Sequence, residues 1–306
     1  MFRPKKTSRC PYCKREAPLF FQTTDRNRHL SEDIFSYYRC RSCRLVFLTP
    51  IPDDLAKYYP SDYYHIPQSV EELGSLVEAQ RYKLDIVQKF VKSGRLLEIG
   101  PASGDFVYHA SQAGFEVETI EMDERCCGFL RDVVGVGAIH SDDAVGAIAE
   151  MAPDVSYDVI ALWQVIEHLP DFWKTIEAAT SRLAEGGILV LAAPNPSSLQ
   201  FRLLKGYWTH VDAPRHVCLI PIKLLTRHTR KLGLRPVLVT TSDVGSLGWN
   251  AFGWRYSFGS FSPAVGRVRG ALFRLGSALT FLLQGVERKG LRGSTYTIVL
   301  KKGPAS

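Results

Sequence analysis

Short apolar runs alternate with helix-like segments along most of the chain beyond residue 94. The runs are short and rich in aliphatic residues, which is typical of strands, and the segments between them carry apolar residues at helical spacing. Seven strands are predicted, at residues 96–99, 117–120, 138–139, 159–162, 188–192, 237–240 and 295–300. Strands that alternate with helices form mostly parallel sheets with helices on both faces. We therefore expect an α/β fold, doubly wound around one seven-stranded, mostly parallel sheet.

Two segments depart from this alternation. Residues 50–70 are rich in Pro and Tyr and are interpreted as a linker that packs through its aromatic rings. Residues 244–294 form an insertion before the last strand, aromatic in its first half, up to Phe261, and apolar at helical spacing from Val265 to Val286, with arginines off the apolar stripe. This helical insertion could lie on an anionic membrane, cover the substrate cleft or form a dimer face.

Four cysteines near the N-terminus form two matching pairs. The pairs CPYC and CRSC are separated by 26 residues, and their members are Cys10, Cys13, Cys40 and Cys43. Two such turns direct four thiolates to one point, as in a tetrahedral zinc site. Two disulfides or four unconnected cysteines are the alternatives. We therefore predict a zinc-ribbon-like module at residues 1–49, with an insertion near residues 25–31, and a main domain at residues 71–306.

The composition indicates the class of protein and the compartment in which it works. The chain has 306 residues, 45% hydrophobic and 23% charged, as expected for a soluble globular protein. It has no apolar run long enough for a membrane span, and no apolar segment of a secretory signal follows its basic start. Cys126, Cys127 and Cys218 fit no pairing pattern and are interpreted as free thiols of a reducing, cytoplasmic compartment.

The net charge of +7 is the sum of unlike parts. Residues 1–44 carry +7, residues 45–244 carry −8, and residues 245–306 carry +8. Because the middle of the chain is acidic, the total does not by itself indicate a nucleic-acid-binding protein. The C-terminal part is both basic and aromatic. We therefore expect any contact with an anionic acceptor or a membrane surface to be made by this part.

The loop after the first strand has the composition of a ligand-binding turn. It reads Glu98-Ile-Gly100-Pro-Ala102-Ser-Gly104 and leads into a helix, whose first N–H groups are open to a ligand. The second strand ends in Glu121, where a carboxylate can accept hydrogen bonds from both hydroxyls of a ribose. The P-loop and the dinucleotide fingerprint are both absent from this loop.

Four segments in order resemble class I S-adenosylmethionine (SAM)-dependent methyltransferases, which are Rossmann-like: LLEIGPASGDF, VETIEMD, YDVIALWQVIEHLPD and LAEGGILVLAAPN. The likeness is greatest to the group with EH after the fourth strand and PN after the fifth. The cysteine module followed by a Tyr-rich linker is similar to the zinc-binding extension of some bacterial sugar methyltransferases. The resemblance implies SAM as cofactor and a structural zinc ion.

The resemblance also implies the cofactor-binding residues. Glu98, Gly100, Ala102 and Gly104 match the glycine-rich loop, with Ala102 in place of the middle glycine. Glu121 matches the ribose ligand, and Met122 would lie against the adenine. Asp142 would bind the adenine amino group, with Asp143 as a near-equal candidate. Trp163 and Gln164 would flank the methionine part of the cofactor. The alternative for each is a residue at a strand end that caps a helix.

A histidine is the expected general base, since its pKa suits proton transfer near neutral pH. The segment WTHVDAPRH, residues 208–216, resembles a motif of the same subgroup, and we favour His216 as the base, with His210 second. The alternative is that this loop is held by packing and hydrogen bonds alone. Some quinone-type relatives hold a divalent cation near the EH pair. Because Gln164 stands where a carboxylate would be needed, we expect Glu167 and His168 to cap a helix.

The leading interpretation is a methyltransferase that modifies an oxygen or a carbon of a small-molecule acceptor, a sugar or glycoconjugate. A nucleic-acid methyltransferase is disfavoured, because the fourth strand leads into LWQV and no Pro-Cys pair offers a nucleophile. A non-catalytic scaffold that uses the zinc module for partner binding is the third hypothesis. We expect a cytoplasmic monomer or homodimer, with peripheral membrane contact through residues 244–290 as a further expectation.

Overall fold

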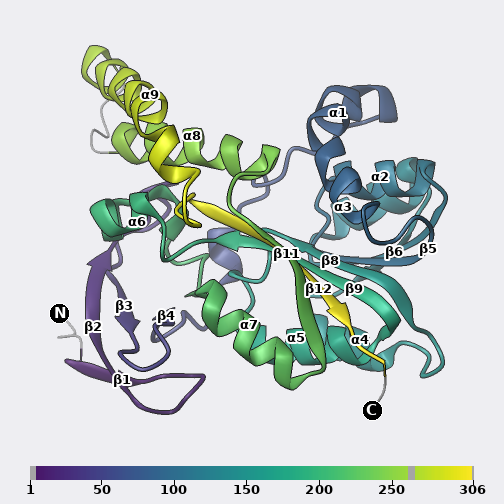
Figure 1. Cartoon of the computed structure of the whole chain (residues 1–306). Helices are drawn as coiled ribbons and strands as arrows, with labels where there is room; N and C mark the ends of the chain where they lie inside the picture. The colour runs from purple at the N-terminus through teal and green to yellow at the C-terminus, as the bar shows by residue number, and fades with distance from the viewer. Residues whose placement is uncertain (1–4, 261–265, 305–306) are drawn as a thin grey trace.

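A computed structural model describes residues 5–260 and 266–304 of the chain (Figure 1). The side chains of residues 75–77 are outside that description, as are Phe261 and Val265 of the predicted insertion. The described part contains one large sheet with helices on both faces, a smaller sheet at the N-terminal side, and a pair of helices of which the second extends away from the body (Figure 1).

The large sheet contains all seven predicted strands. Its order is β11-β12-β9-β8-β5-β6-β7. The strands are β5 (Gly94–Ile99), β6 (Phe115–Glu121), β7 (Gly137–His140), β8 (Tyr157–Trp163), β9 (Leu183–Pro194), β11 (Leu234–Thr240) and β12 (Thr295–Lys302). The neighbours from β9 to β7 run parallel, and β12 runs antiparallel to both of the strands beside it, β11 and β9. The predicted fold class is thereby confirmed.

Helices cover both faces of this sheet because its strands alternate buried apolar side chains between the faces. Leu96 and Val159 belong to one core, and Leu97 and Ile160 belong to the other. The first core packs under α1 (Val70–Val87) and α2 (Asp105–Gln112), with α3 (Glu124–Phe129) and the π-helical turn η2 (Leu130–Val134) beside them. The second packs over α4 (Ala144–Glu150), α5 (Phe172–Ser181) and α7 (Ile222–Lys231).

The order of the strands reverses between β5 and β8, which are adjacent and parallel. Chains that leave these two strands go to opposite faces, so a crevice opens beyond their carboxyl ends. The glycine-rich loop follows β5, and the EH segment follows β8. The fold therefore places the two predicted motifs at one position in space.

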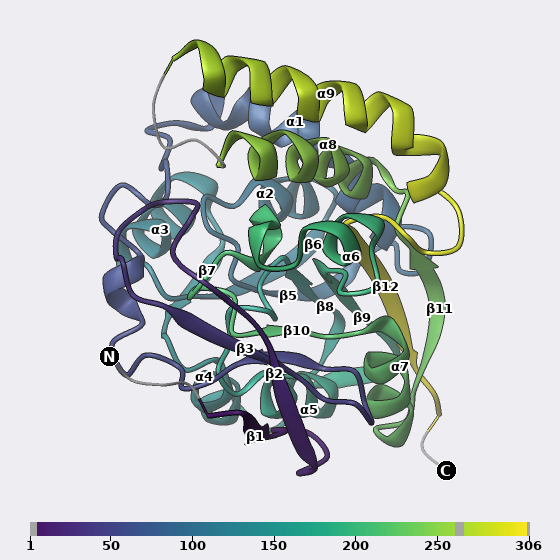
Figure 2. The same ribbon diagram turned by 90° about the vertical axis from the view of Figure 1, so that its left-hand side faces the viewer.

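The cysteine module forms a second sheet, of order β1-β2-β3-β4-β10 (Figure 2). Its own strands are β1 (Thr7–Arg9), β2 (Glu16–Thr23), β3 (Phe35–Arg39) and β4 (Val46–Leu48). The fifth strand, β10 (Cys218–Leu219), lies two residues beyond His216 and pairs antiparallel with β4. Cys10, Cys40 and Cys43 share a buried cluster with residues of α5 and α7. The module is thus continuous with the main domain.

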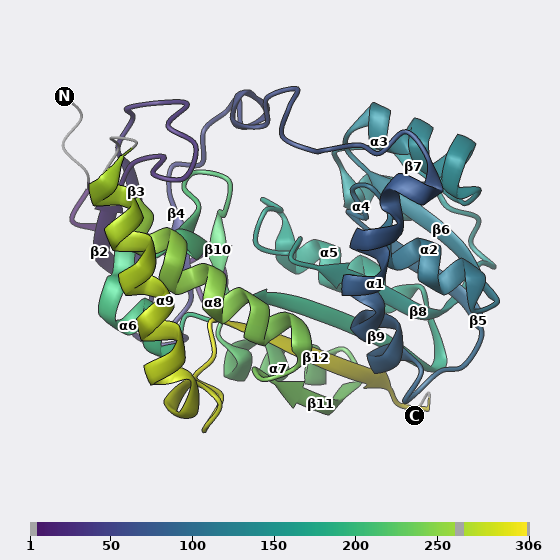
Figure 3. The same cartoon turned by 90° about the horizontal axis from the view of Figure 1, so that it is seen from above.

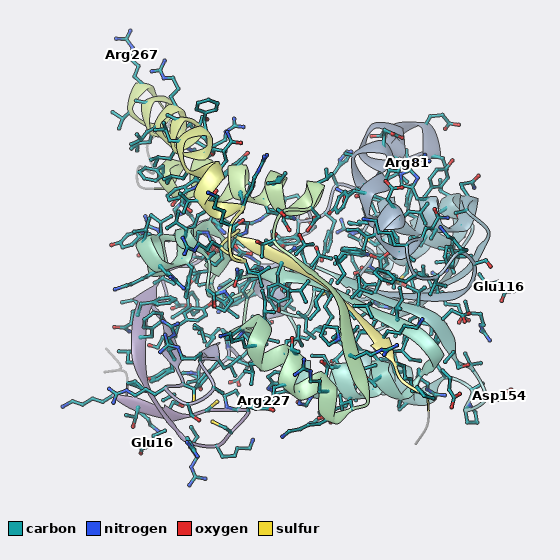
Figure 4. All side chains as sticks on the ribbon, viewed as in Figure 1. Glu16, Arg81, Glu116, Asp154, Arg227 and Arg267 are labelled. Atoms are coloured by element: carbon teal, nitrogen blue, oxygen red, sulfur yellow. The ribbon has the colours of Figure 1, made fainter. Side chains whose placement is uncertain are left out.

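The insertion consists of two helices, α8 (Val244–Gly259) and α9 (Arg267–Glu287), which pack on each other (Figure 3). Glycines allow the close approach. A Cβ on Gly259 would lie 2.5 Å from Cε2 of Phe273, and one on Gly276 would lie 2.7 Å from Cα of Arg255. The helix α8 lies against the main domain and α9 lies outside it, with Arg267 pointing away at the far end (Figure 4).

Four short helical segments complete the described chain: η1 (Ala56–Tyr58), α6 (Leu199–Leu204), η3 (Lys205–Tyr207) and η4 (Thr209–Val211). Among the helices of residues 5–260 and 266–304, none combines the length and the apolar character needed to cross a membrane.

Candidate functional site

A cavity of about 550 Å³ lies at the crevice between β5 and β8. This volume is within the range of small-molecule sites, roughly 300–1,000 Å³. Seven of the nine predicted cofactor residues line it: Gly100, Ala102, Glu121, Met122, Asp142, Trp163 and Gln164. The WTHVDAPRH loop, the linker and the insertion within the cysteine module line the same cavity. Residues far apart in the sequence therefore share one cavity.

Glu121 is held rigidly at one end of this cavity. Its carboxylate is buried and accepts N–H donation from Ala102 at 2.9 Å, from Met122 at 2.8 Å and from Asp123 at 2.9 Å. Burial raises the pKa of Glu121, and the three backbone hydrogen bonds oppose that shift. Two of the donors bind Oε1 and one binds Oε2, so Oε2 keeps acceptor capacity for a ligand hydroxyl.

The glycine-rich loop has left-handed backbone at Gly100, Ala102 and Gly104, with φ of 71°, 52° and 84°. A Cβ on Gly100 would lie 2.7 Å from Cγ2 of Val165, and one on Gly104 would lie 2.6 Å from Cδ2 of Leu130. A side chain at either position would displace a neighbouring side chain and would have to adopt a left-handed backbone conformation, so both positions favour glycine. Ala102 adopts the same conformation with a side chain present, which places its N–H on Glu121.

Three non-glycine residues with positive φ line the cavity: Ala102, Gln164 at 58° and Asp212 at 36°. Such conformations cost roughly 1–3 kcal/mol each and persist only where the surroundings impose them. They follow β5, β8 and η4, three separate segments that meet here. This clustering is independent support for a functional site at the cavity.

The structure separates the two aspartates that follow β7. Asp143 caps α4, accepting N–H donation from Val145 and Gly146 at 3.0 Å each. Asp142 lines the cavity, and no helix cap formed by it is found in the described residues. A side chain engaged in a cap is not available to a ligand, so Asp142 is the better candidate.

Two predicted cofactor residues lie away from the cavity wall. Gly104 precedes α2 and packs on Leu130. Glu98 is buried under the loop, and burial raises its pKa to about 8, opposed by the positive charge of Lys83. Oε2 of Glu98 is buried and has no hydrogen-bond partner among the described residues. Both residues support the glycine-rich loop on the side away from the cavity. Direct contact of either residue with a ligand stays a prediction.

His216, the residue predicted as the general base, lines the cavity. Its Nδ1 lies 2.8 Å from the carbonyl oxygen of His210, an acceptor, so the proton of the neutral ring is assigned to Nδ1. Nε2 is then the basic nitrogen, and the ring lines the cavity. Burial lowers the pKa of His216, opposed by the charge of Asp212. The ring is therefore neutral at pH 7, as a base must be.

His210 is more constrained. Its Nε2 lies 3.1 Å from the carbonyl oxygen of Trp249, and its ring packs against Trp208 and Phe252 at centroid distances of 4.9 and 5.7 Å. Burial lowers its pKa to about 4. Both histidines line the cavity, but His210 is enclosed by aromatic rings and its carbonyl oxygen orients His216.

The expectation that Glu167 and His168 cap a helix is wrong. The following helix α5 begins at Phe172 with Asp171 at its N-cap, four residues after the EH pair. Glu167 is buried, neither of its oxygens has a hydrogen-bond partner among the described residues, and burial raises its pKa to about 8. Nδ1 of His168 is bonded to the hydroxyl of Tyr59 at 2.8 Å.

These two residues join His216 at the cavity wall. The rings of His168 and His216 meet edge to face at a centroid distance of 4.4 Å. Ligand atoms of Glu167, His168 and His216 all lie within 4.8 Å of one another. One carboxylate and two imidazoles are donor types that bind transition metals, so this cluster is compatible either with a base supported by neighbours or with a cation.

The four N-terminal cysteines form the predicted cluster. Sγ atoms of Cys10 and Cys43 are 3.5 Å apart, those of Cys13 and Cys40 are 3.4 Å apart, and those of Cys13 and Cys43 are 3.9 Å apart. A tetrahedral zinc site with Zn–S bonds of about 2.3 Å has S···S edges of roughly 3.8 Å. A disulfide needs about 2.05 Å, and all four cysteines are free. The residues present fit zinc.

The two cysteine turns have the same backbone. Cys10 N–H donates to the carbonyl of Arg15, and Cys40 N–H donates to that of Leu45. The residue after each second cysteine, Lys14 or Arg44, has positive φ of 60° or 66°. Two copies of one turn face each other, which directs four sulfurs to a common centre.

The segment between the two cysteine pairs, near residues 25–31, also lines the cavity. Nothing in the sequence indicated this contact. Asn27 and Arg28 line the cavity, and Nδ2 of Asn27 donates to Oδ1 of Asp212 at 2.6 Å. Asp25 is bound to Arg215 at 2.7 Å, and both side chains are fully buried. Arg215 also binds Asp212 at 2.7 Å, so one guanidinium joins the cysteine module to the WTHVDAPRH loop.

The linker also forms part of the wall. Tyr59, Tyr63 and Tyr64 line the cavity, with ring centroids of successive pairs at 4.9 and 4.8 Å. Trp249 and Phe252 of α8 line it as well. The Tyr-rich composition of residues 50–70 was the signal for the first group, and the aromatic composition of residues 244–261 was the signal for the second.

Comparisons with known proteins agree on the main domain. A model of the methyltransferase domain (Methyltransf_23) matches residues 76–239. A ubiquinone biosynthesis O-methyltransferase of Paramagnetospirillum magneticum is 26% identical over 108 residues, 35% of this chain and 43% of that protein. The chain thus spans less than half the length of the curated relatives that it matches.

Solved structures share the fold. A SAM-dependent methyltransferase from Archaeoglobus fulgidus is 17% identical, with a TM-score of 0.51 over 75% of this chain and 94% of that one. Phosphoethanolamine N-methyltransferase 2 of Haemonchus contortus, solved with SAM, is 16% identical, with a TM-score of 0.52 over 84% of this chain and 62% of that one. At these identities the likeness concerns the fold alone.

Proposed function

The chain belongs to the methyltransferase-domain family, and from that premise we propose that it transfers the methyl group of SAM to an oxygen or a carbon of a small-molecule acceptor, a sugar or glycoconjugate. The observation that carries the proposal is a single cavity with the buried carboxylate of Glu121 at one end and Nε2 of His216 at the other. One end offers a ribose ligand and the other offers a base.

The residues at the first end fit SAM. Glu121 would accept hydrogen bonds from the ribose, Met122 would lie against the adenine, and Asp142 would bind its amino group. Trp163 and Gln164 would flank the methionine part. Glu98, Gly100, Ala102 and Gly104 would form the loop beneath the cofactor. When bound, SAM supplies an electrophilic methyl group, so the protein has mainly to align the acceptor and handle its proton.

His216 would accept the proton of the acceptor at Nε2. A sugar hydroxyl that loses its proton there becomes the nucleophile, and a carbon beside a carbonyl group could be activated in the same way. The resulting imidazolium would be stabilised by Asp212, whose charge raises the pKa of His216. His210 is the second candidate, and through its carbonyl oxygen it also fixes the tautomer of His216.

Zinc held by Cys10, Cys13, Cys40 and Cys43 would have a structural role. A metal with four cysteine ligands has no open position for a substrate. By fixing the cysteine module, it would hold Asn27 and Arg28 at the acceptor end of the cavity. The module would then contribute to the site without touching the reacting atoms.

Peripheral contact with an anionic membrane is proposed for the outer face of α9. Val268, Phe281 and Leu282 are 65%, 73% and 69% exposed. The helix carries Arg267, Arg269 and Arg274, and its one acidic residue, Glu287, is buried. Exposed apolar side chains beside cations match the surface of a cytoplasmic membrane. A dimer face is the alternative use of the same surface.

Calorimetry with SAM and a screen for labelled-methyl transfer test the function. Acceptors in the screen are nucleotide sugars and lipid-linked saccharides, and bulk RNA is included as the nucleic-acid control. We expect SAM to bind and one sugar class to be methylated. Transfer to RNA that is abolished by nuclease would overturn the sugar proposal, and absence of SAM binding would overturn the enzymatic one.

A further inference from the structure

A second cavity of about 490 Å³ adjoins the first at its acceptor end. The two share Asn27, Arg28, Thr209 and Phe252, and none of these is a predicted cofactor residue. We call the second cavity the arginine vestibule. Its remaining lining residues are Arg26, His29, Leu30, Pro60, Asp62, Tyr256, Gly259, Ser260, Arg269 and Phe273.

The vestibule is basic. Three guanidinium groups, those of Arg26, Arg28 and Arg269, converge on it from the cysteine module and from α9, against the one carboxylate of Asp62. Arg28 and Arg269 take part in none of the ion pairs formed within the described part of the chain. Within that part of the chain, neither guanidinium is paired with a carboxylate.

Aromatic rings hold these arginines in place. Arg28 lies over the ring of Tyr63 at 4.4 Å, and Arg269 lies over that of Phe273 at 5.7 Å. Nε of Arg269 is buried, and no residue in the described ranges hydrogen-bonds it. A guanidinium held on a ring can donate two parallel hydrogen bonds to a phosphate through its terminal N–H groups.

We propose that the arginine vestibule binds a phosphate or diphosphate ester of the acceptor, so that the enzyme methylates a phosphate-bearing sugar. This inference rests on the proposed function, which supplies the acceptor. The sugar would enter the main cavity toward His216 while its phosphate stays beside Arg28 and Arg269. Binding energy from this remote group would align the sugar with the methyl donor.

An aromatic wall of the vestibule suits the group that is attached to the phosphate. Phe252 and Tyr256 of α8 are stacked, with centroids 4.2 Å apart and planes at 26°. Such a surface accepts either a nucleobase or an isoprenoid chain. A nucleoside diphosphate sugar and a polyprenyl-linked sugar therefore share the chemistry that the arginines recognise, and the experiment must distinguish them.

Calorimetry at low salt with three probes tests the proposal: pyrophosphate, UDP, and a polyprenyl phosphate in detergent micelles. The test variant is Arg28→Gln/Arg269→Gln. The control is Arg267→Gln/Arg274→Gln, which removes the same charge from exposed positions of α9 that line neither cavity. Circular dichroism and the Kd for SAM verify that both variants fold.

We expect at least one probe to bind the wild type, and its Kd to rise by at least about tenfold in the test variant and to stay unchanged in the control. Tighter binding of UDP than of pyrophosphate would identify a nucleotide-linked acceptor, and tighter binding of the polyprenyl phosphate a lipid-linked one. The proposal is overturned if no probe binds, or if both variants bind as the wild type does.

The same experiment distinguishes a wrong phosphate-site proposal from a wrong methyltransferase proposal. A protein that binds SAM and methylates a neutral sugar, while ignoring all three probes, keeps the proposed function and loses the phosphate site. A protein that binds a probe through Arg28 and Arg269 but does not bind SAM keeps the anion site and loses the methyltransferase proposal.

Discussion

The hydroxyl of Tyr37 donates a hydrogen bond of 2.7 Å to the carbonyl oxygen of His216. Tyr37 lies on β3, between the two cysteine pairs, and is fully buried. The candidate base is therefore fixed on one side by its own loop, through the carbonyl of His210, and on the other by the cysteine module. This one contact joins the module of the proposed zinc site to the residue proposed as the base.

Replacing Tyr37 tests that link. We expect Tyr37→Phe to lower kcat while zinc content and the Kd for SAM stay unchanged, since the lost hydroxyl bonds only the carbonyl oxygens of His216 and Val211 among the described residues. Stability should fall by about 1–3 kcal/mol, because a buried carbonyl loses its donor. The matched control is Tyr38→Phe, the next residue, whose hydroxyl donates to the carbonyl of Lys5. Equal kcat values in the two variants would contradict the link.

Removal of His216 tests the base. His216→Ala should lose roughly 10²–10⁴-fold in turnover and keep SAM binding. His210→Ala should mainly lower Tm, since that ring is enclosed by Trp208, Trp249 and Phe252. Metal analysis belongs in the same experiment. One zinc per chain fits a free base, whereas a second metal that disappears in His216→Ala would assign the ring to a cation.

The pH profile gives an independent test of His216. Burial lowers its pKa, so the neutral, basic form persists below the usual histidine range. The value of kcat/KM should therefore fall as the pH drops through that lowered pKa and should be level above it. A midpoint above the ordinary value of about 6.5 would contradict the assignment.

The two aspartates after β7 give a paired prediction. Asp142→Ala should weaken SAM binding by about tenfold without loss of stability, because its carboxylate lines the cavity. Asp143→Ala should leave the Kd for SAM unchanged and cost about 1 kcal/mol, because it removes the cap of α4. The reverse pattern would exchange their roles.

Substitutions in the glycine-rich loop test the effect of Ala102, which stands in place of the middle glycine. Ala102→Gly should stay within about 1 kcal/mol of the wild type, on the stabilising side, because glycine relieves a left-handed conformation. Gly104→Ala should instead destabilise by about 1–3 kcal/mol, since its Cβ would lie 2.6 Å from Leu130. Thermal unfolding with and without SAM measures both, and a destabilised Ala102→Gly would show that the methyl group itself is needed.

Sedimentation with anionic vesicles tests α9. We expect the wild type to bind at low salt and to be released as salt rises. Phe281→Ser/Leu282→Ser should lose binding. A control that removes apolar side chains of similar exposure elsewhere, Ile34→Ser/Leu203→Ser, should retain it. If both double variants sediment alike, or if the wild type stays in solution at low salt, membrane contact through α9 is wrong.

Local patterns in the sequence were enough to predict the strands of the main sheet and part of the candidate site. The seven strands follow from runs of aliphatic residues, which are buried wherever a strand lies between two layers of helices. The glycine-rich loop and Glu121 sit at strand ends, so their meeting at one edge follows from a parallel sheet alone. The cysteine cluster follows from its spacing, because each turn brings two sulfurs together without help from the rest of the chain.

Only the tertiary structure decided which residues complete the site. Asn27 meets Asp212, and Arg28 meets Tyr63, across segments that no local pattern connects. Two hydrogen bonds decide which aspartate caps α4, and one decides which nitrogen of His216 is left without the proton. Periodicity and spacing report the interactions of a residue with its sequence neighbours, whereas this acceptor end is built from contacts between distant segments, which exist only once the chain has folded.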